Sequence, residues 1–153
     1  MSKTIVLLDL NFTLVSNSLD ANFRASQYES QIAKETYRTD LIELIRHHHV
    51  CLVTVRHKRY EAQTLARINE LTGWQPQEAF FRDIEASPVK WKSSVLKLLK
   101  EREAPDTCFL AIESNDDNAA MYVKHGVLSL KVWGGQHRSE SVKPTTGAPS
   151  ELI

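Results

Sequence analysis

The amino-acid sequence predicts an α/β fold in three layers, with a mainly parallel sheet covered by helices on both faces. Four short runs of apolar and β-branched residues recur along the chain, and longer amphipathic stretches separate them. This alternation is typical of βαβ units, and uninterrupted apolar runs indicate strands that are buried on both faces. The expected strands are Ile5 to Asp9, Val50 to Val55, Cys108 to Ile112 and Leu128 to Trp133.

The stretches between these strands have the apolar spacing of helices that pack one face on a sheet. The second expected helix ends at Gly73, and the third begins at Ser87-Pro88, a capping residue followed by a proline. The fourth begins near Asn115 to Asn118, where acidic side chains suit the positive end of the helix dipole, and it runs to Gly126. The apolar positions of the first three helices are Leu41, Ile42, Leu44 and Ile45; Leu65, Ile68 and Leu71; and Val89, Val95, Leu96, Leu98 and Leu99. The fourth helix is expected to run through Ala119, Ala120 and Val123.

The length of the chain suits one domain with one core. Its 153 residues are enough to bury about two-thirds of the surface that the unfolded chain exposes. After Gly134-Gly135 the sequence turns to serine, threonine, proline, glycine and charged residues, with no apolar period. We therefore expect a single domain over residues 1–136 and a disordered tail over residues 137–153.

The composition narrows the classes of partner. The formal net charge is zero and 25% of the residues are charged, so overall charge gives no reason to expect nucleic-acid binding. Two local basic clusters, Arg56 to Arg59 and Lys90 to Lys92, remain candidates for contact with phosphate. With neither a secretory signal pattern nor a membrane-length apolar run, the sequence predicts a cytoplasmic protein without a membrane partner.

Cysteine and histidine residues offer two further clues. Cys51 and Cys108 each lie inside an apolar, strand-like run, which predicts buried, reduced thiols. The run His47 to His49 follows the apolar helix that ends near Ile45. Because consecutive residues do not share one face of a helix, we interpret this run as a polar helix end rather than as a metal site.

Polar residues follow three of the expected strands. Asp9, Thr54 and Glu113 stand at or next to strand ends. Right-handed crossovers bring the carboxyl ends of parallel strands to one edge of the sheet, where α/β proteins bind their ligands. The sequence therefore predicts a functional crevice that contains these three side chains.

Four sequence motifs stand in a characteristic order along the chain. They are Asp9-Leu10-Asn11-Phe12-Thr13; Leu52-Val53-Thr54-Val55-Arg56; Trp91-Lys92-x-x-x-Leu96; and Phe109 to Asp117, followed by Met121-Tyr122 and Gly126-Val127. The set resembles the haloacid dehalogenase (HAD) superfamily, and it is most similar to the phosphatase domains of polynucleotide kinase/phosphatases. Any one of these motifs alone would be a weak signal.

The resemblance implies an Mg²⁺-dependent phosphomonoesterase. By the family pattern, Asp9 is the nucleophile that forms an aspartyl-phosphate, and it is also a metal ligand. The backbone carbonyl of Asn11 is a second ligand. Glu113 occupies the first acidic position of the fourth motif, and Ser114 stands where the second acid is expected, so Asp116 or Asp117 is an alternative ligand.

The same resemblance assigns the groups that hold the phosphate. It implies that the Thr54 hydroxyl binds a phosphoryl oxygen and that Arg56 makes a second contact. A lysine at a helix start neutralises the phosphate and the nucleophile; Lys90 and Lys92 both qualify, and the motif favours Lys92. The short connection between the first two strands leaves no room for a large cap domain, which implies an open site for a phosphorylated substrate such as a nucleic-acid end or a nucleotide.

Asn11 departs from the family pattern. The family has an aspartate there, which protonates the leaving oxygen and later activates water. A carboxamide keeps the backbone carbonyl but does not transfer protons, and losing a general acid–base costs about 10²–10⁴-fold in rate. The sequence thus leaves open a weakened phosphatase, a long-lived phospho-Asp9, and a catalytically impaired phosphate-binding or regulatory domain. A flavodoxin-like phospho-receiver is a further alternative, but it does not explain Thr13.

Overall fold

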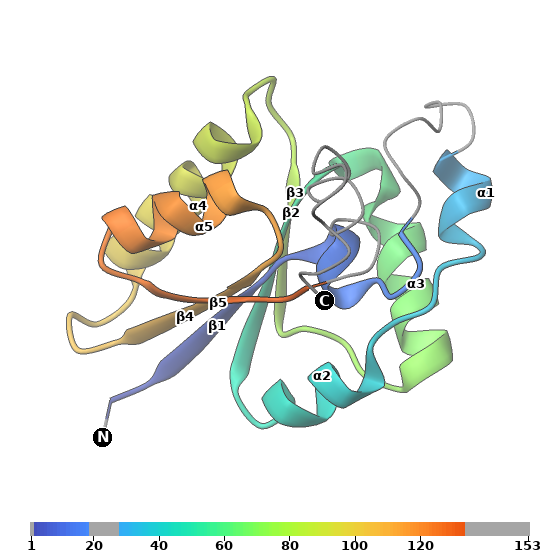
Figure 1. Cartoon of the computed structure of the whole chain (residues 1–153), viewed down its shortest axis with the longest axis horizontal. Helices are drawn as coiled ribbons and strands as arrows, with labels where there is room; N and C mark the ends of the chain where they lie inside the picture. The colour runs from blue at the N-terminus through green and yellow to red at the C-terminus, as the bar shows by residue number, and fades with distance from the viewer. Residues whose placement is uncertain (1, 19–27, 134–153) are drawn as a thin grey trace, which may run out of the picture.

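The computed structural model describes residues 2–18 and 28–133, and these fold around one five-stranded parallel sheet (Figure 1). The strand order is β3-β2-β1-β4-β5, and every pair of neighbouring strands is parallel. The strands are β1 (Thr4–Leu8), β2 (His49–His57), β3 (Glu78–Arg82), β4 (Cys108–Glu113) and β5 (Leu128–Lys131). The predicted α/β fold with a parallel sheet is confirmed.

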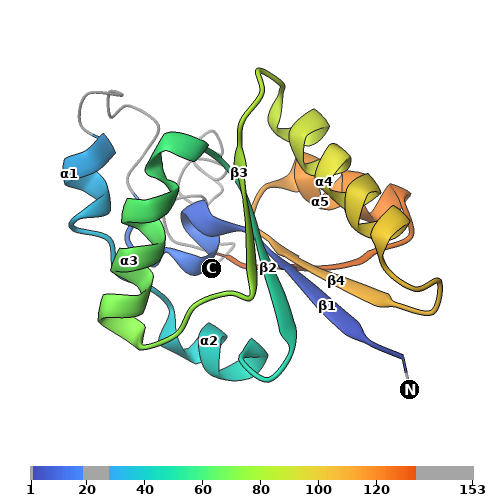
Figure 2. The same cartoon turned by 180° about the vertical axis from the view of Figure 1, so that it is seen from behind.

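Helices cover both faces of the sheet and complete the three layers (Figures 1 and 2). On one face lie α2 (Thr39–Ile45) and α3 (Glu61–Thr72), with the short α1 (Tyr28–Ile32) packed against α3. On the other face lie α4 (Pro88–Arg102) and α5 (Asp116–Lys124). A five-residue turn, η1 (Leu10–Leu14), follows β1; it is not a regular helix, because Asn11 and Phe12 have non-helical backbone angles. A 3₁₀ turn, η3 (Lys58–Tyr60), follows β2.

Alternate residues of the central strand β1 point into two separate cores, as the two-residue period of a strand requires. Val6 and Leu8 pack with Ile42 and Ile45 of α2 and with Ile68 of α3. Ile5 and Leu7 pack in the second core with side chains from α4 and α5, including Trp91, Val95, Leu99, Met121 and Tyr122. The sheet is therefore buried on both sides, which explains the continuous apolar runs of the sequence.

The predicted helix ends are present in the structure. The Ser87 hydroxyl accepts a hydrogen bond from the backbone N–H of Lys90 at the start of α4, and Pro88 is the first helical residue. Gly73 ends α3 with a φ of 70°, a left-handed conformation that costs glycine little. The Asn115 side chain caps α5 by accepting from the N–H of Asn118.

Three apolar positions that we expected on core-facing sides of helices are exposed instead, as are Val123 and Ala120 of the fourth helix. Leu44 is 77% exposed and Leu98 is 50% exposed because each lies on the far side of a helix whose core stripe is narrower than the apolar pattern. Leu71 is 44% exposed in the last turn of α3, and Val123 is 60% exposed near the end of α5. The apolar periodicity placed these helices correctly but overstated the width of their buried faces.

Sequence reasoning missed one strand and misplaced the end of another. The edge strand β3 contains only three apolar residues between charged ones, and four of its five residues are partly exposed, so its pattern is weak. Strand β2 continues to His57, so Thr54 and Arg56 lie inside it rather than at its end. The pairing of β2 with β1 nevertheless stops at Leu52, so both residues lie beyond the part of β2 that β1 covers.

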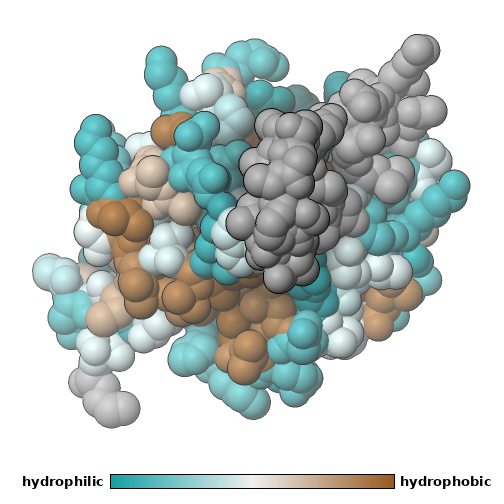
Figure 3. Space-filling view, in the orientation of Figure 1, coloured by the Kyte–Doolittle hydropathy of each residue, from teal (hydrophilic) through white to brown (hydrophobic). Residues whose placement is uncertain are grey.

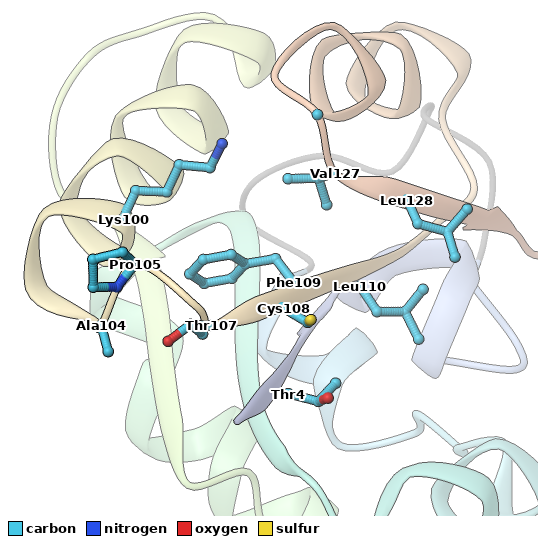
Figure 4. Close-up of a pocket in the computed structure, with 11 residues that line it drawn as sticks. Thr4, Lys100, Ala104, Pro105, Thr107, Cys108, Phe109, Leu110, Val127 and Leu128 are labelled. Carbon is cyan, nitrogen blue, oxygen red and sulfur yellow. The ribbon is translucent and has the colours of Figure 1, made fainter. Parts of the chain in front are cut away.

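The amino ends of β1 and β4 and the outer strand β5 form a partly apolar surface. Leu128 and Leu130 are exposed, and Figure 3 shows hydrophobic side chains gathered around this strand. Beside it lies a hollow that includes Thr4, Lys100, Phe109 and Leu128 (Figure 4). Cys108 also lines this hollow and is exposed, which corrects the prediction that its thiol is buried, because it is the first residue of β4.

The remaining predictions concern the membrane and the chain ends. Among residues 2–18 and 28–133, no helix is both long and apolar enough to cross a membrane. The predicted tail over 137–153 lies outside the described residues, and the single domain over 1–136 stays a prediction at its carboxyl boundary.

Candidate active site

Asp9 and Glu113 lie side by side at the carboxyl edge of the sheet. Asp9 directly follows β1, and its backbone N–H donates to the carbonyl of Ile112 in β4 at 3.0 Å. Glu113 is the last residue of β4. Because the chain leaves β1 and β4 toward opposite sides of the sheet, this is its topological switch point, where α/β proteins form ligand sites.

Lys92 joins the two carboxylates. Its Nζ donates to Asp9 Oδ1 and to Glu113 Oε2, each at 2.7 Å. The lysine lies in the second turn of α4 and is 1% exposed. Its neighbour Trp91 fixes the start of α4 against β2, because the indole N–H donates to the carbonyl of Thr54 at 2.7 Å. Lys90 is exposed, so the structure places Lys92 and not Lys90 in the site.

The electrostatics of this cluster follow from burial and mutual attraction. Burial disfavours the Lys92 ammonium, but the nearby Asp9 and Glu113 carboxylates outweigh it and raise the pKa of Lys92 above its usual value. Burial, together with the negative charge of Asp9, raises the pKa of Glu113. Since two carboxylates share a single ammonium, the cluster favours the approach of a further cation or a proton.

The turn after β1 orients the Asp9 side chain. The Thr13 hydroxyl donates to Asp9 Oδ2 at 2.6 Å, and the Ser114 hydroxyl lies 3.4 Å from the same oxygen. Phe12 has a φ of 63° and is the one non-glycine residue with positive φ in the described ranges. A bulky residue rarely adopts this conformation, and such strain is concentrated at functional sites. The Phe12 N–H donates to the hydroxyl of Ser18 at 2.7 Å, which holds the turn closed.

Oxygen atoms gather where a divalent cation would sit. The Ser114 hydroxyl lies 3.5 Å from the backbone carbonyl oxygen of Asn11 and close to Asp9 Oδ2. Glu113 Oε1 accepts from the N–H groups of Ser114 and Asn115, each at 3.2 Å, so both Glu113 oxygens already have donors. Such an all-oxygen donor set suits Mg²⁺, which Asp9, the Asn11 carbonyl and Ser114 could hold.

Two acidic residues near the start of α5 lie apart from this cluster. Asp116 pairs with Lys131 of β5. Asp117 lines surface hollows on either side of the start of α5. Among the described residues, no hydrogen bond or ion pair joins Asp117 to Asp9, Lys92 or Glu113. The structure thus brings Glu113 next to Asp9 but leaves Asp117 at the surface.

Arg56 is the centre of a second buried network that also holds Asn11. One terminal nitrogen donates to Asn11 Oδ1 at 2.8 Å and to Glu35 Oε2 at 2.5 Å; the other donates to Glu35 Oε1 at 3.1 Å and to Thr64 Oγ1 at 2.9 Å. Its Nε donates to the Tyr28 hydroxyl at 3.2 Å. All five N–H donors of the guanidinium are therefore in use, so a phosphate must displace a partner to contact Arg56.

Glu35 is a buried site residue that sequence reasoning missed. It is 2% exposed, and its pairing with Arg56 outweighs the effect of burial and raises the pKa of that guanidinium. Glu35 lies between α1 and α2, and nothing in the local sequence distinguishes it from a surface acid. Thr54 lies two residues before Arg56 in β2 and is 1% exposed. Its hydroxyl accepts a hydrogen bond from the backbone N–H of Arg56 at 3.0 Å.

Comparison with known proteins supports the fold. No model of a known protein family matches the chain, and no curated protein matches it. Solved structures do match. A chain of the Pnkp1/Rnl/Hen1 RNA repair complex is 14% identical to this protein, with a TM-score of 0.66. The match covers 88% of this protein and 44% of that chain. A second structure of this complex gives 16% identity, a TM-score of 0.64 and coverages of 88% and 47%. Our chain thus spans less than half the length of those chains.

A single-domain match extends over nearly the whole chain. The HAD domain of the effector protein Lem4 from Legionella pneumophila is 12% identical, with a TM-score of 0.51 and 97% coverage of both chains. At these identities the likeness concerns the fold alone. The protein therefore has a HAD-like α/β fold, as the order of its motifs predicted.

Proposed function

We propose that this protein is an Mg²⁺-dependent phosphomonoesterase of the HAD type in which Asp9 is the nucleophile. The observation that carries the proposal is the Lys92 ammonium 2.7 Å from both Asp9 and Glu113, at the switch point of the sheet. Titratable groups that are perturbed by burial and by a specific charge partner in a crevice are candidates for a functional site, and here a strained turn lies beside them. The HAD-like fold supports the same interpretation.

Asp9, Lys92 and Thr13 have different roles in the proposed reaction. A carboxylate oxygen of Asp9 attacks phosphorus, the ester oxygen leaves with the bonding electron pair and takes up a proton, and water later hydrolyses the aspartyl-phosphate. Lys92 offsets negative charge on Asp9 and on the transferred group, and Thr13 keeps the Asp9 side chain in one orientation. Mg²⁺, when bound beside Asp9 and the Asn11 carbonyl, would neutralise phosphate charge.

Asn11 makes the proposed activity slow. Its side chain is held by Arg56 at the place where the family pattern has its general acid–base, and an amide is neither an acid nor a base near neutral pH. We expect leaving groups of low pKa to react best, because they need no proton. The same contact favours a second candidate function, a phosphate-binding or regulatory domain. In such a domain, the hydrogen bond between Arg56 and Asn11 would maintain the shape of the crevice, and bound phosphate esters would not be hydrolysed.

We propose a large or extended phosphorylated substrate, such as the end of a polynucleotide. The exposed cations Lys58 and Arg59 follow β2 at the same edge of the sheet as Asp9, where they can meet a phosphodiester backbone. The described segment between β1 and β2 contains only short elements and no cap. The structural similarity to a chain of an RNA repair complex agrees with this substrate class.

The test combines turnover with intact-mass spectrometry. The full chain is incubated with Mg²⁺ and an aryl phosphate, beside Asp9→Asn as the matched, nearly isosteric control. We expect slow hydrolysis or a phosphate adduct on the wild-type chain, and neither on Asp9→Asn. Hydrolysis that Asp9→Asn retains would refute Asp9 as nucleophile. Neither turnover nor adduct, together with phosphate binding by calorimetry, would favour the binding-domain function.

A further inference from the structure

A second group of possible metal ligands lies at the opposite edge of the sheet. His49 and Cys51 are two residues apart at the start of β2, so their side chains point to the same face. Cys51 is the register partner of Glu78 at the start of β3, so these two side chains are neighbours across the strands. We call His49, Cys51 and Glu78 the amino-edge cluster, because it lies at the amino ends of the strands and Asp9 and Glu113 follow their carboxyl ends.

The donor atoms of this cluster are close enough to share one ion. His49 Nε2 lies 2.8 Å from Glu78 Oε2, and Cys51 Sγ lies 3.6 Å from the same oxygen. One ligand atom from each residue falls within 4.8 Å of the other two. Ligands about 2.0–2.3 Å from a tetrahedral Zn²⁺ stand about 3.3–3.8 Å apart, so small side-chain movements suffice.

The chemistry of the donors selects the ion. One sulfur, one imidazole nitrogen and one carboxylate oxygen suit Zn²⁺ and its borderline relatives, whereas Mg²⁺ prefers oxygen alone. Cys51 is fully buried, but the side chains of His49 and Glu78 are 27% and 26% exposed, so the cluster opens to solvent on one side. Solvent can therefore deliver the ion and supply its fourth ligand.

Arg102 shows how the cluster balances its charge in the structure as described. The guanidinium at the end of α4 donates to both carboxylate oxygens of Glu78, each at 2.7 Å. When a cation binds, one Glu78 oxygen can turn to the ion while the other keeps its hydrogen bond to Arg102. The Cys51 thiol loses its proton to solvent as the metal–sulfur bond forms. The proton that His49 Nε2 donates to Glu78 moves to Nδ1 or to solvent, so that Nε2 can bind the ion.

We propose that the amino-edge cluster is a Zn²⁺ site separate from the proposed phosphatase site. The ion would connect the edge strand β3 to β2 beneath the last turn of α4, and it would stabilise the folded chain by binding it in preference to the unfolded one. The run His47 to His49 therefore contributes one ligand, His49, while His47 and His48 lie exposed between α2 and β2.

The test follows metal binding to the full, reduced, metal-free chain. Coordination by Cys51 gives a thiolate-to-cobalt charge-transfer band when Co²⁺ is added, and one equivalent of Zn²⁺ abolishes it. We expect this band in the wild type and in the matched control Cys108→Ser, and we expect Cys51→Ala to lose it. His49→Gln should weaken Zn²⁺ binding by at least about tenfold relative to the wild type, and His48→Gln should not.

Two results would overturn the proposal. One is the absence of the band in the wild type, or a band that Cys51→Ala retains. The other is equal Zn²⁺ affinity in His49→Gln and His48→Gln. If circular dichroism shows that Cys51→Ala does not fold, the histidine pair decides, because both positions reach the surface. None of these results bears on the phosphatase proposal, whose residues lie at the other edge of the sheet.

Discussion

Under the proposed mechanism, replacing Asn11 by aspartate should supply much of the general acid–base catalysis that asparagine does not provide. The change is nearly isosteric, and Asn11 Oδ1 already accepts a hydrogen bond from Arg56 at 2.8 Å, so the new carboxylate can keep this position. The full gain for general acid–base catalysis is about 10²–10⁴-fold. Arg56 stabilises the ionised form of the new acid and so weakens it as a proton donor, although Glu35 already offsets part of that positive charge.

We therefore expect the lower end of this range, about 10²-fold in kcat, which corresponds to about 3 kcal/mol of barrier. The assay is steady-state hydrolysis in Mg²⁺ of an alkyl phosphate, whose leaving group needs a proton, beside an aryl phosphate, which needs it less. The gain should be larger for the alkyl ester. Asn11→Ala is the control, since it removes the Arg56 contact without adding a carboxylate, and it should give no gain.

A folded Asn11→Asp protein that binds Mg²⁺ but accelerates hydrolysis of the alkyl ester less than tenfold would contradict this prediction. The double variant that combines Asn11→Asp with Asp9→Asn separates two explanations. If its activity equals that of Asn11→Asp, hydrolysis does not pass through Asp9, and the proposed nucleophile is wrong. If it is inactive, the carboxylate at position 11 acts only together with Asp9.

Three further predictions concern stability and thiol chemistry. Lys92→Met leaves two buried carboxylates without their cation and should lower the free energy of unfolding by about 3–5 kcal/mol in urea titrations; a loss below about 1 kcal/mol would contradict this. Hydrogen bonds from Arg102 lower the pKa of Glu78 from 4.5 to about 2. The ionised Glu78 therefore contributes to stability above pH 4.5, and this contribution is lost as the pH falls through 2. Acid unfolding curves of Arg102→Gln should depend less on pH in this range. Burial raises the pKa of the Cys51 thiol to about 12, so Ellman's reagent at pH 8 should titrate one thiol, Cys108, in the native chain and two in the unfolded chain; two fast thiols in the native chain would contradict the burial of Cys51.

Local sequence patterns were sufficient for most of the fold. Four of the five strands, the Ser87 cap and the Gly73 terminator all rest on residues close together in the chain, so their signals survive without tertiary context. The edge strand β3 was not predicted, because it is only partly buried and contains few apolar residues. Exposure of Leu44 and Leu98 likewise depends on how far the sheet extends beneath each helix, which periodicity does not report.

The candidate site divides in the same way. The motif order alone singled out Asp9, Lys92 and Glu113, and the structure brings these three together. Glu35 belongs to none of the four motifs. It joins the buried network only through its pairing with Arg56, which is 21 residues away in the chain. The amino-edge cluster was also invisible, because Cys51 and Glu78 become neighbours only through the register of β2 with β3.

By itself, the sequence determined the type of fold, the carboxylate after the first strand and the asparagine two residues after it. These are properties of short segments, fixed by apolar periodicity, turn chemistry and side-chain identity. The tertiary structure decided that Lys92 rather than Lys90 enters the site and that Arg56 holds Asn11. Such contacts join residues 83 and 45 positions apart, and their geometry exists only when strand order and helix packing bring distant segments to one edge of the sheet.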